Sequence, residues 1–314
     1  MSKTSVAKMV SFGSKTILPH LSRQSRGSPL SLPLRQSFST STPLQSPSDW
    51  VTTEHLDEKI AVVRLHRKPA NALSLKMCQA ISEAIQNLER DGTTQAMILE
   101  SSLPNKIFSA GLDISTELYK PDRDRLPDFW RSFQQLFLDL YGSKNLTTIA
   151  SLEGPAPAAG CMLAMSCDYR VASSSNKTTI GLNESHLGIV APPWLCQQYI
   201  DVLGHRKAEL ALLSGQLFRP LEALQIGLVD ELVDNVEDEN AVQLASIVRA
   251  KEFCKIPQGA KAAVKELTRT PLMHKLISER EKDVDFFCEF VTSEAAQKAI
   301  GRYLEALADK SKKK

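Results

Sequence analysis

The sequence has no long apolar run, and its cysteines and histidines form no recognisable pattern. No apolar stretch approaches the ~20 residues that a membrane-spanning helix needs, so we predict no membrane span. The six cysteines are scattered without a C-x-x-C pair, and we expect them to be reduced, small core residues rather than a disulfide framework. The six histidines are equally dispersed, which predicts no metal site.

Several common catalytic motifs are also missing. The sequence contains no G-x-x-x-x-G-K-[ST] phosphate loop, no G-x-S-x-G elbow and no H-E-x-x-H pair. No glycine-rich dinucleotide fingerprint follows a predicted strand either. These absences argue against the usual ATPase, serine hydrolase, zinc protease and dinucleotide-dependent enzymes.

Acidic residues are absent from residues 1–48, which are rich in Ser and carry six Lys or Arg residues. This composition predicts a mitochondrial transit peptide over residues 1–42, disordered and later removed, and a disordered basic tail is the alternative. Removing those six from the 38 basic residues leaves 32 against 36 acidic residues, a net charge of −4. A mildly acidic body without a basic stripe argues against nucleic acid as a partner.

Beyond residue 50 the pattern predicts an α/β fold. Residues 52–65 are rich in β-branched residues around a polar turn, which predicts a hairpin. Asn71 or Ser74 can cap a helix that ends near Gly92, and residues 95–100 then form a buried strand, so a strand–helix–strand crossover is expected. Further strands are expected at 147–152, 168–172 and 229–233, and further helices at 129–141, 161–167, 194–203, 204–213 and 221–227.

The last part of the chain is predicted to be entirely helical. Apolar residues recur at helical spacing over 239–254, 257–268, 271–289 and 293–309. The change from alternating elements to helices predicts a core at residues 50–235 that contains the active site, followed by a C-terminal helical region at 236–310.

A single acid stands in uncharged surroundings between Thr179 and Trp194. A carboxylate held among apolar groups loses solvation, which raises its pKa and makes Glu184 a better proton acceptor near neutral pH. The alternative is a surface acid or a helix cap, because Asn183-Glu184-Ser185 also resembles a helix start. His186 could orient Glu184 or be an ordinary loop histidine.

Two turns of small residues precede this acid. In the first, over 108–114, a strand end runs into Gly111, where the backbone can approach a ligand and the following amides can face a negative oxygen. In the second, over 153–160, Ala and Gly residues provide either close helix packing or room for a ligand beside bare amides.

Three segments together resemble the crotonase (enoyl-CoA hydratase/isomerase) superfamily over roughly residues 50–310. They are FSAGLDI (108–114), EGPAPAAGCMLAMSCDYRVA (153–172) and IGLNESHLGI (180–189). The resemblance implies an α/β, crotonase-like spiral of ββα units with a C-terminal helical trimerisation region, assembled as a homotrimer. It also implies an acyl-CoA thioester substrate, no cofactor beyond the coenzyme A of that substrate, and a location in the mitochondrial matrix.

The resemblance also assigns roles to individual residues. It implies an oxyanion hole made by the backbone amides of Ala110 and Ala159, and a catalytic role for Glu184. Ala159 stands where the family commonly has Gly, but the amide remains. The positions expected to contact substrate are Ala110, Gly111, Leu112, Asp113, Ile114, Ala159 and Asn183.

Some of these assignments leave alternatives open. Asn183 could touch the substrate or only shape the turn that presents Glu184. Asp113 is better explained as a helix-start acid, favoured by the helix dipole, than as a proton carrier. Arg67 and Lys68 match a region that meets the adenine end of coenzyme A in relatives, and a solvated loop is equally compatible.

The reaction type depends on residue 162. Hydratases of the family carry a second acid where this chain has Met162, and a thioether can neither activate nor position water. A 1,3-proton shift needs only one carboxylate, so we expect conversion of a 3-cis- or 3-trans-enoyl thioester into its 2-trans isomer. The alternatives are a hydratase or another crotonase, and a catalytically silent acyl-CoA-binding protein.

Overall fold

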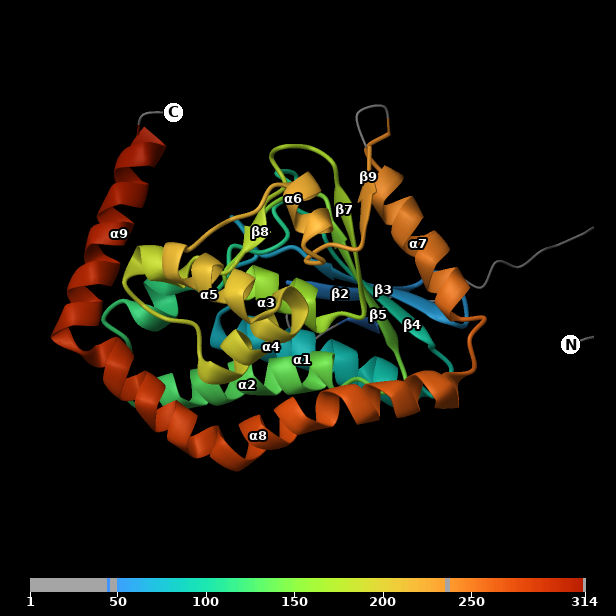
Figure 1. Cartoon of the computed structure of the whole chain (residues 1–314), viewed down its shortest axis with the longest axis horizontal. Helices are drawn as coiled ribbons and strands as arrows, with labels where there is room; N and C mark the ends of the chain where they lie inside the picture. The colour runs from blue at the N-terminus through green and yellow to red at the C-terminus, as the bar shows by residue number, and fades with distance from the viewer. Residues whose placement is uncertain (1–43, 46–49, 235–237, 313–314) are drawn as a thin grey trace, which may run out of the picture. The chain divides into compact units, whose positions relative to one another are not determined.

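The computed structural model describes residues 44–45, 50–234 and 238–312 (Figure 1). The predicted transit segment, residues 1–42, lies outside the described residues. The strands are β1 (Leu44–Gln45), β2 (Val51–His55), β3 (Ile60–Leu65), β4 (Ala96–Ser101), β5 (Thr147–Leu152), β6 (Ala156–Pro157), β7 (Tyr169–Ser173), β8 (Ile180–Gly181) and β9 (Glu231–Val233). The helices are α1 (Leu75–Asp91), the π-helix η1 (Ile114–Leu118), α2 (Leu126–Tyr141), α3 (Ala159–Ser166), the 3-10 helix η2 (Glu184–Leu187), α4 (Pro193–Leu203), α5 (His205–Ser214), α6 (Pro220–Gln225), α7 (Ala241–Phe253), α8 (Gln258–Thr292) and α9 (Glu294–Lys312).

One mixed sheet organises the fold. Its strands lie in the order β1-β2-β3-β4-β5-β7-β9, antiparallel up to β3 and parallel from β3 onward. The predicted hairpin is confirmed, and Asp57 closes its turn by accepting hydrogen bonds from the amides of Lys59 and Ile60. A second, two-stranded sheet pairs β6 with β8 in parallel.

The predicted strand–helix–strand crossover is also confirmed. Ser74 accepts a hydrogen bond from the Met77 amide and caps the start of α1. Of the two caps expected from the sequence, Asn71 and Ser74, the second is therefore the one used. Gly92, with φ of 72°, ends the helix in the left-handed conformation. The chain returns as β4, parallel to β3, so the α/β class predicted from the sequence is confirmed.

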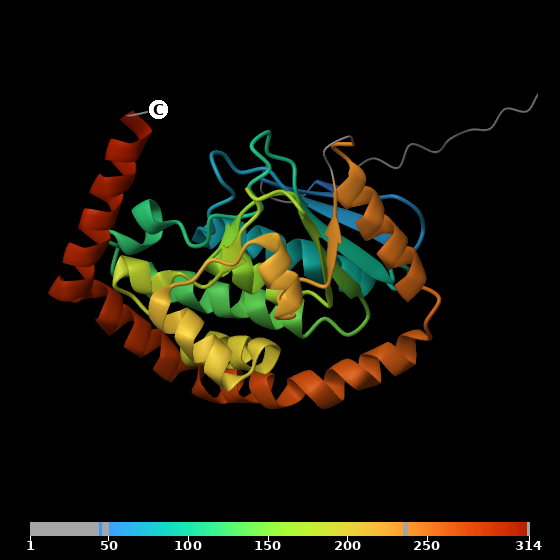
Figure 2. The same cartoon turned by 45° about the horizontal axis from the view of Figure 1, so that its top comes forward.

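The main sheet has a core on each of its faces. Because side chains alternate along a strand, Ala61 and Val63 join the large core that includes α1 and α2, whereas Ile60 and Val62 face the other way. This second core is closed by α7, which runs beside the sheet (Figure 2). Val242 of α7 is buried in this core. The sheet is therefore covered by helices on both faces.

Two local predictions are wrong. The helices expected at 257–268 and 271–289 form one 35-residue helix, α8, with Pro271 inside it. Leu272 and Leu276 are buried just beyond the proline, so packing against the core carries the helix through the interruption. The strand end expected at Phe108 is irregular backbone, and only a single bridge, Leu73 to Leu112, joins that segment to its neighbour.

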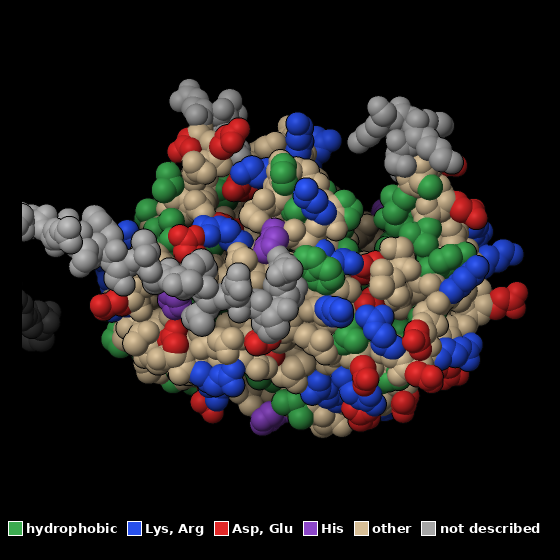
Figure 3. Space-filling view, turned by 180° about the vertical axis from the view of Figure 1, so that it is seen from behind, with side chains coloured by type: hydrophobic (Ala, Val, Ile, Leu, Met, Phe, Trp, Pro, Cys, Tyr) green, Lys and Arg blue, Asp and Glu red, His purple; other side chains and the backbone are tan. Residues whose placement is uncertain are grey.

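Charged side chains of both signs lie interspersed over the face seen in Figure 3. Among the residues that the structure describes, no helix is long and apolar enough to cross a membrane. Within the same residues, no cluster of three His, Cys, Asp or Glu side chains could hold a metal ion. All six cysteines are free; three of them, Cys78, Cys161 and Cys167, are buried.

A carboxylate on α8 links three helices. One oxygen of Asp283 accepts hydrogen bonds from Trp130 Nε1 (2.8 Å), Gln134 Nε2 (2.8 Å) and Trp194 Nε1 (3.3 Å). Trp130 and Gln134 belong to α2, and Trp194 lies in α4, directly after the segment that contains Glu184. Trp130 also stacks on Phe287 of α8, with ring centroids 3.5 Å apart. These contacts attach α8 to the part of the core that carries the candidate acid.

We expect Asp283→Ala to lower the free energy of unfolding by about 3 kcal/mol, because it leaves three N–H donors without their common acceptor. Asp285→Ala, two residues along the same helix at an exposed position, should change stability by less than about 0.5 kcal/mol. Urea unfolding of both variants measures the difference, and equal effects would contradict the role of Asp283.

Candidate active site

The two predicted turns meet through their backbones. A Cβ atom on Gly111 would lie 3.1 Å from the amide nitrogen of Ala159 and 3.0 Å from the Cβ of Ala158. A Cβ atom on Gly160 would lie only 2.3 Å from the carbonyl oxygen of Ser109. Gly111 also has φ of 90°, which residues with side chains rarely adopt. Glycine at both positions therefore allows the turns, about fifty residues apart in the chain, to touch.

The first oxyanion donor expected from the sequence is not available. The amide of Ala110 donates to the carbonyl oxygen of Ala70 at 2.9 Å. The amide of Gly111 donates to Ser109 Oγ at 3.2 Å. The assignment of an oxyanion role to Ala110 is therefore corrected, because its N–H already has an acceptor within the protein.

The neighbouring amide of Leu112 is the donor that this turn leaves open. Leu73 pairs with the residues on either side of Leu112, donating to Gly111 O (2.8 Å) and accepting from Asp113 N (2.9 Å). In a parallel bridge the N–H of the residue between these two points away from the partner strand. Among the described residues this N–H has no acceptor, so it is free to bind a ligand oxygen.

The second expected donor, the amide of Ala159, is also open. Ala159 is the first residue of α3, and the first N–H groups of a helix have no acceptor within it. The preceding amide, of Ala158, donates instead to Gly181 O at 2.8 Å. The Ala159 amide lies at the positive end of the α3 dipole, which favours a negatively charged oxygen there.

The pairing of β6 with β8 brings the third segment to the same place. Pro157 pairs with Gly181, and Glu184 begins η2 three residues later. Burial raises the pKa of the Cys161 thiol, and the charge of Glu184 raises it further. The carboxylate therefore lies within electrostatic reach of the beginning of α3, where the Ala159 amide has no acceptor among the described residues.

Glu184 has the environment expected from its sequence neighbours. Its Oε2 atom is buried and has no hydrogen-bond partner among the described residues. Burial raises the pKa of this carboxyl from 4.5 to about 7, opposed only by its own backbone amide. Leu187 and Trp194, which follow Glu184 within ten positions of the sequence, are almost fully buried. A carboxyl group with a pKa near 7 can both accept and release a proton at neutral pH.

The residues beside Glu184 do not orient its carboxylate. His186 is exposed, and its Nε2 atom is bonded to the carbonyl oxygen of Ser214 at 2.8 Å, which agrees with an ordinary loop histidine. Asn183 makes no side-chain cap to η2, and its Oδ1 atom is buried without a partner among the described residues. Met162 is fully buried in α3 and supplies no second acid.

Asp113 and Arg67 form an internal ion pair at 2.5 Å. Burial alone would raise the pKa of Asp113, but hydrogen bonds from Arg67, Thr116 and Ser115 lower it on balance. Asp113 caps η1, which agrees with its interpretation as a helix-start acid. Arg67 also donates to Ala72 O through Nη1, so two of its nitrogens have acceptors within the protein. Its contact with a coenzyme A phosphate stays a prediction.

Asn71 is a positioning residue that the sequence did not reveal. It is fully buried with φ of 50°, and its side chain donates to Phe108 O (3.0 Å) and Ser101 Oγ (2.9 Å). Its Oδ1 atom accepts the Arg67 amide at 2.8 Å. Asn71 thus attaches the loop before α1 to the turn that presents Leu112. Its candidate role as a helix cap is taken by Ser74.

Helix α9 borders the same site from the far end of the chain. Gln297 donates to Leu118 O and accepts from the Lys120 amide, both at 2.8 Å, at the end of η1. Figure 1 shows α9 as the last helix of the chain, at the edge of the molecule. A Cβ atom on Gly188, directly after η2, would lie 2.9 Å from Ala299. Helix α9 therefore contacts both η1 and η2, and η2 begins with Glu184. No local sequence signal predicts contacts between residues almost 180 positions apart.

Comparisons with known proteins agree with this geometry. The sequence profile described as enoyl-CoA hydratase/isomerase matches residues 55–313. Over 251 residues the chain is 42% identical to enoyl-CoA delta isomerase 1, mitochondrial, of Rattus norvegicus, covering 80% of this chain and 84% of the rat protein. It is 29% identical over 215 residues to methylglutaconyl-CoA hydratase, mitochondrial, of Mus musculus, covering 67% of this chain and 66% of the mouse protein.

A solved structure is similar as well. The human mitochondrial delta3-delta2-enoyl-CoA isomerase superimposes with a TM-score of 0.79 at 35% identity, covering 83% of this chain and 99% of the human one. The α/β architecture with C-terminal helices is therefore shared with a crotonase whose structure is known.

The raised pKa of Glu184 predicts a pH-dependent cost to stability. Between pH 4.5 and about 7 the folded protein keeps a proton that the unfolded chain releases, so stability falls as pH rises through this window. Glu184→Gln cannot ionise and should be more stable than the wild type above pH 7, by up to about 3 kcal/mol. The advantage should vanish near pH 4.

Urea unfolding at pH 5 and pH 8 measures this effect. Glu279→Gln, at an exposed position on α8, removes the same charge and serves as the control. A Glu184→Gln variant whose stability relative to the wild type is the same at both pH values would show that the carboxyl is not desolvated.

Proposed function

The chain belongs to the enoyl-CoA hydratase/isomerase family, and we propose that it is an isomerase that moves the double bond of 3-cis- or 3-trans-enoyl-CoA to the 2-trans position. This reaction serves the β-oxidation of unsaturated fatty acids. The observation that carries the proposal is Glu184, whose buried Oε2 atom has no partner among the described residues and which the β6–β8 pairing brings toward α3. The amides of Leu112 and Ala159 are open, and Met162 stands where a second acid would be required for hydration.

In the first step the thioester carbonyl oxygen accepts hydrogen bonds from the amides of Leu112 and Ala159. Glu184 removes a proton from C2, and the electrons of the C2–H bond spread over a dienolate. Its negative charge lies largely on the oxygen held by the two amides. Removing one such donor typically costs ~3–4 kcal/mol of transition-state stabilisation. Glycine at position 111 supports this geometry because it allows the two turns to touch.

In the second step the protonated Glu184 delivers its proton to C4, and the double bond forms between C2 and C3. The same carboxyl serves both steps because C2 and C4 of the acyl chain are close together. A pKa near 7 supports this role, because neither the ionised nor the protonated form is then strongly favoured at neutral pH. The apolar residues after Glu184, including Leu187 and Trp194, keep water from the dienolate.

The remaining substrate contacts follow the same turns. Gly111, Leu112 and Ile114 lie along the acyl thioester, and Asn183, whose buried Oδ1 atom has no partner among the described residues, can accept a hydrogen bond from the ligand. Asp113 acts indirectly, since it ties Arg67 to the turn. No cofactor is required beyond the coenzyme A of the substrate. Lys68, an exposed residue, remains available to a phosphate group.

We expect Glu184→Gln to lower kcat for 3-cis-enoyl-CoA by at least about 10³-fold, because both proton transfers lose their only carrier. KM should change little, since the amides and apolar contacts that bind the thioester remain. Formation of the conjugated 2-enoyl thioester, followed by its ultraviolet absorbance, measures the reaction.

The alternatives give different results in the same experiment. A catalytically silent acyl-CoA-binding protein would show no turnover even as wild type. A hydratase would add water to 2-trans-enoyl-CoA at a rate comparable to isomerisation, whereas the present proposal requires hydration to be at least about 100-fold slower. Glu279→Gln, the exposed control, should retain wild-type turnover.

The assembly and location belong to the same proposal. Leu213 of α5 and Leu267 and Phe286 of α8 are each more than half exposed. Contact with further chains would remove these apolar side chains from water. We expect three chains to assemble through the helical region. The rat and human relatives are named as mitochondrial, and the composition of residues 1–42 supports import, so we place the protein in the mitochondrial matrix.

Sedimentation velocity should show a species of three 34.7 kDa chains at micromolar concentration. Leu267→Glu, which places a charge on one of these exposed apolar positions, should shift the population toward monomers. A wild-type protein that sediments as a monomer would contradict the proposed trimer without affecting the chemistry of Glu184.

A further inference from the structure

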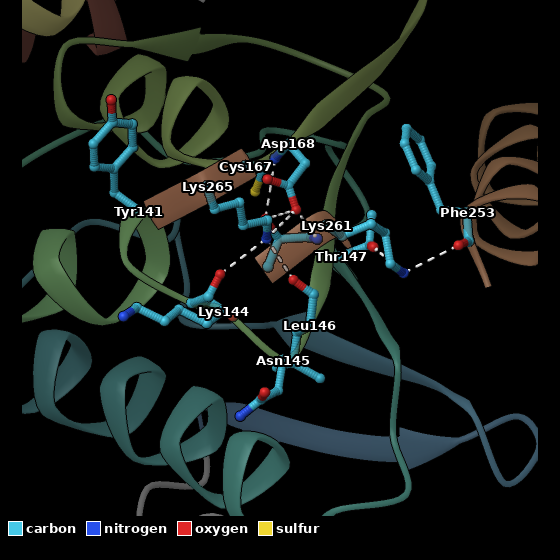
Figure 4. Close-up of polar contacts among 12 residues, drawn as sticks. Tyr141, Lys144, Asn145, Leu146, Thr147, Cys167, Asp168, Phe253, Lys261 and Lys265 are labelled. Atoms are coloured by element: carbon cyan, nitrogen blue, oxygen red, sulfur yellow. Dashed lines mark hydrogen bonds and ion pairs between the residues drawn. The ribbon is translucent and has the colours of Figure 1, made fainter. Parts of the chain in front are cut away.

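A groove lies between the first half of α8, the end of α7 and the beginning of β5, and it contains none of the residues of the candidate active site. It has a volume of about 290 Å³. Its polar side is formed by Thr147, Asp168, Lys261, Lys265 and Arg269, and its apolar side by Phe253, Ile256, Ala260 and Val264. Figure 4 shows the polar side, with Lys265 and Lys261 entering from α8.

The charges that line the groove do not balance. Asp168 is the acid in the lining, and it forms ion pairs with both Lys265 (2.5 Å) and Arg269 (2.6 Å). With Lys261 the lining carries three positive charges against one negative charge. The Asp168 side chain is only 11% exposed and already pairs with two cations. Its single negative charge therefore does not balance the additional positive charge of Lys261.

Lys261 has only uncharged partners at hydrogen-bond distance. Its Nζ atom donates to Thr147 Oγ1 (2.9 Å) and to Phe253 O (3.0 Å), and forms no ion pair among the described residues (Figure 4). An ammonium group has three N–H donors, so one is left for a ligand. Burial lowers the pKa of Lys261, and the charges of Cys254 and Asp168 offset this only in part. A bound anion would therefore stabilise its charged form.

The opposite side of the groove exposes apolar surface. Ile256 is 45% exposed and Val264 60% exposed, and both line the groove beside Lys261. A small hydrophilic anion would leave this surface in water, whereas an alkyl chain would cover it. The arrangement of one anion-binding head and an adjacent apolar strip matches a ligand with a single negative charge and a hydrocarbon tail.

We propose that this groove is a second binding site, which takes a carboxylate with an apolar tail, such as a medium-chain fatty acid. The carboxylate accepts a hydrogen bond from Lys261 Nζ, and the tail lies along Ile256 and Val264. The site is separate from the thioester site and does not depend on the proposed isomerase activity.

The test is calorimetric titration of the full chain with octanoate, octanol and acetate. Octanoate should bind at least tenfold more tightly than octanol, which lacks the charge, and than acetate, which lacks the tail. Lys261→Met keeps the length and apolar character of the side chain and should weaken octanoate binding at least tenfold. Lys275→Met, at an exposed position on the same helix, should change it less than twofold.

Octanoate could also enter the thioester site, and the variants separate the two locations. Binding that is equally strong in Lys261→Met and in the wild type would overturn the proposal, as would the absence of octanoate binding.

A second measurement needs no variant. Reductive methylation of the wild type, read by mass spectrometry, should modify Lys261, and octanoate should protect it at least fivefold while leaving Lys275 unprotected. Lack of protection overturns the proposal. Lys261 that is unreactive before octanoate is added also overturns it, because a second copy of the chain would then cover the groove.

Discussion

The close approach of two backbone turns is the constraint on which the rest of the structure depends. Gly111 and Ala159 are so close that a Cβ atom on the glycine would lie 3.1 Å from the Ala159 amide nitrogen, which is tighter than an ordinary contact. The surrounding elements maintain this approach: Asn71 holds the first turn to the preceding loop, and the pairing of β6 with β8 holds the second. The amides of Leu112 and Ala159 thereby remain without acceptors in the part of the chain that the structure describes. Backbone donors are rigid, so they bind a developing negative charge without having to reorganise.

The second requirement is a carboxylate kept away from water. No cation pairs with Glu184 among the described residues, and burial raises its pKa to about 7. Such a group is unfavourable for folding once it is ionised, so other contacts must compensate. The segment that carries Glu184 is held at one end by Trp194, which is bonded to Asp283, and is covered by α9. The contacts of α8 and α9 thus help to offset the folding free energy lost when the Glu184 carboxylate is ionised in its desolvated position.

Helix α8 connects these functions. Its basic residues Lys261, Lys265 and Arg269 recur every four positions, so they lie on one face. They reach carbonyl oxygens at the ends of α2 and α7 and before β5, and Asp168 directly before β7. Further along the same helix, Asp283 contacts the region of the candidate active site. A ligand in the groove at Lys261 would therefore contact the same helix that supports the Glu184 segment.

The sequence by itself determined the features that depend on neighbouring residues. The β2–β3 hairpin, the capped helix α1, strand β5 and the desolvated Glu184 all follow from patterns within a few residues, because local spacing decides which side chains can be buried together.

The tertiary structure alone decided which amide remains open. Ala110 and Leu112 belong to the same turn, but Ala70 and Leu73 occupy its other donors and acceptors. Arg67 pairs with Asp113, 46 positions away, and α8 continues through Pro271 because distant residues of the core cover Leu272 and Leu276. Such outcomes depend on partners far apart in the chain, whose meeting leaves no local trace in the sequence.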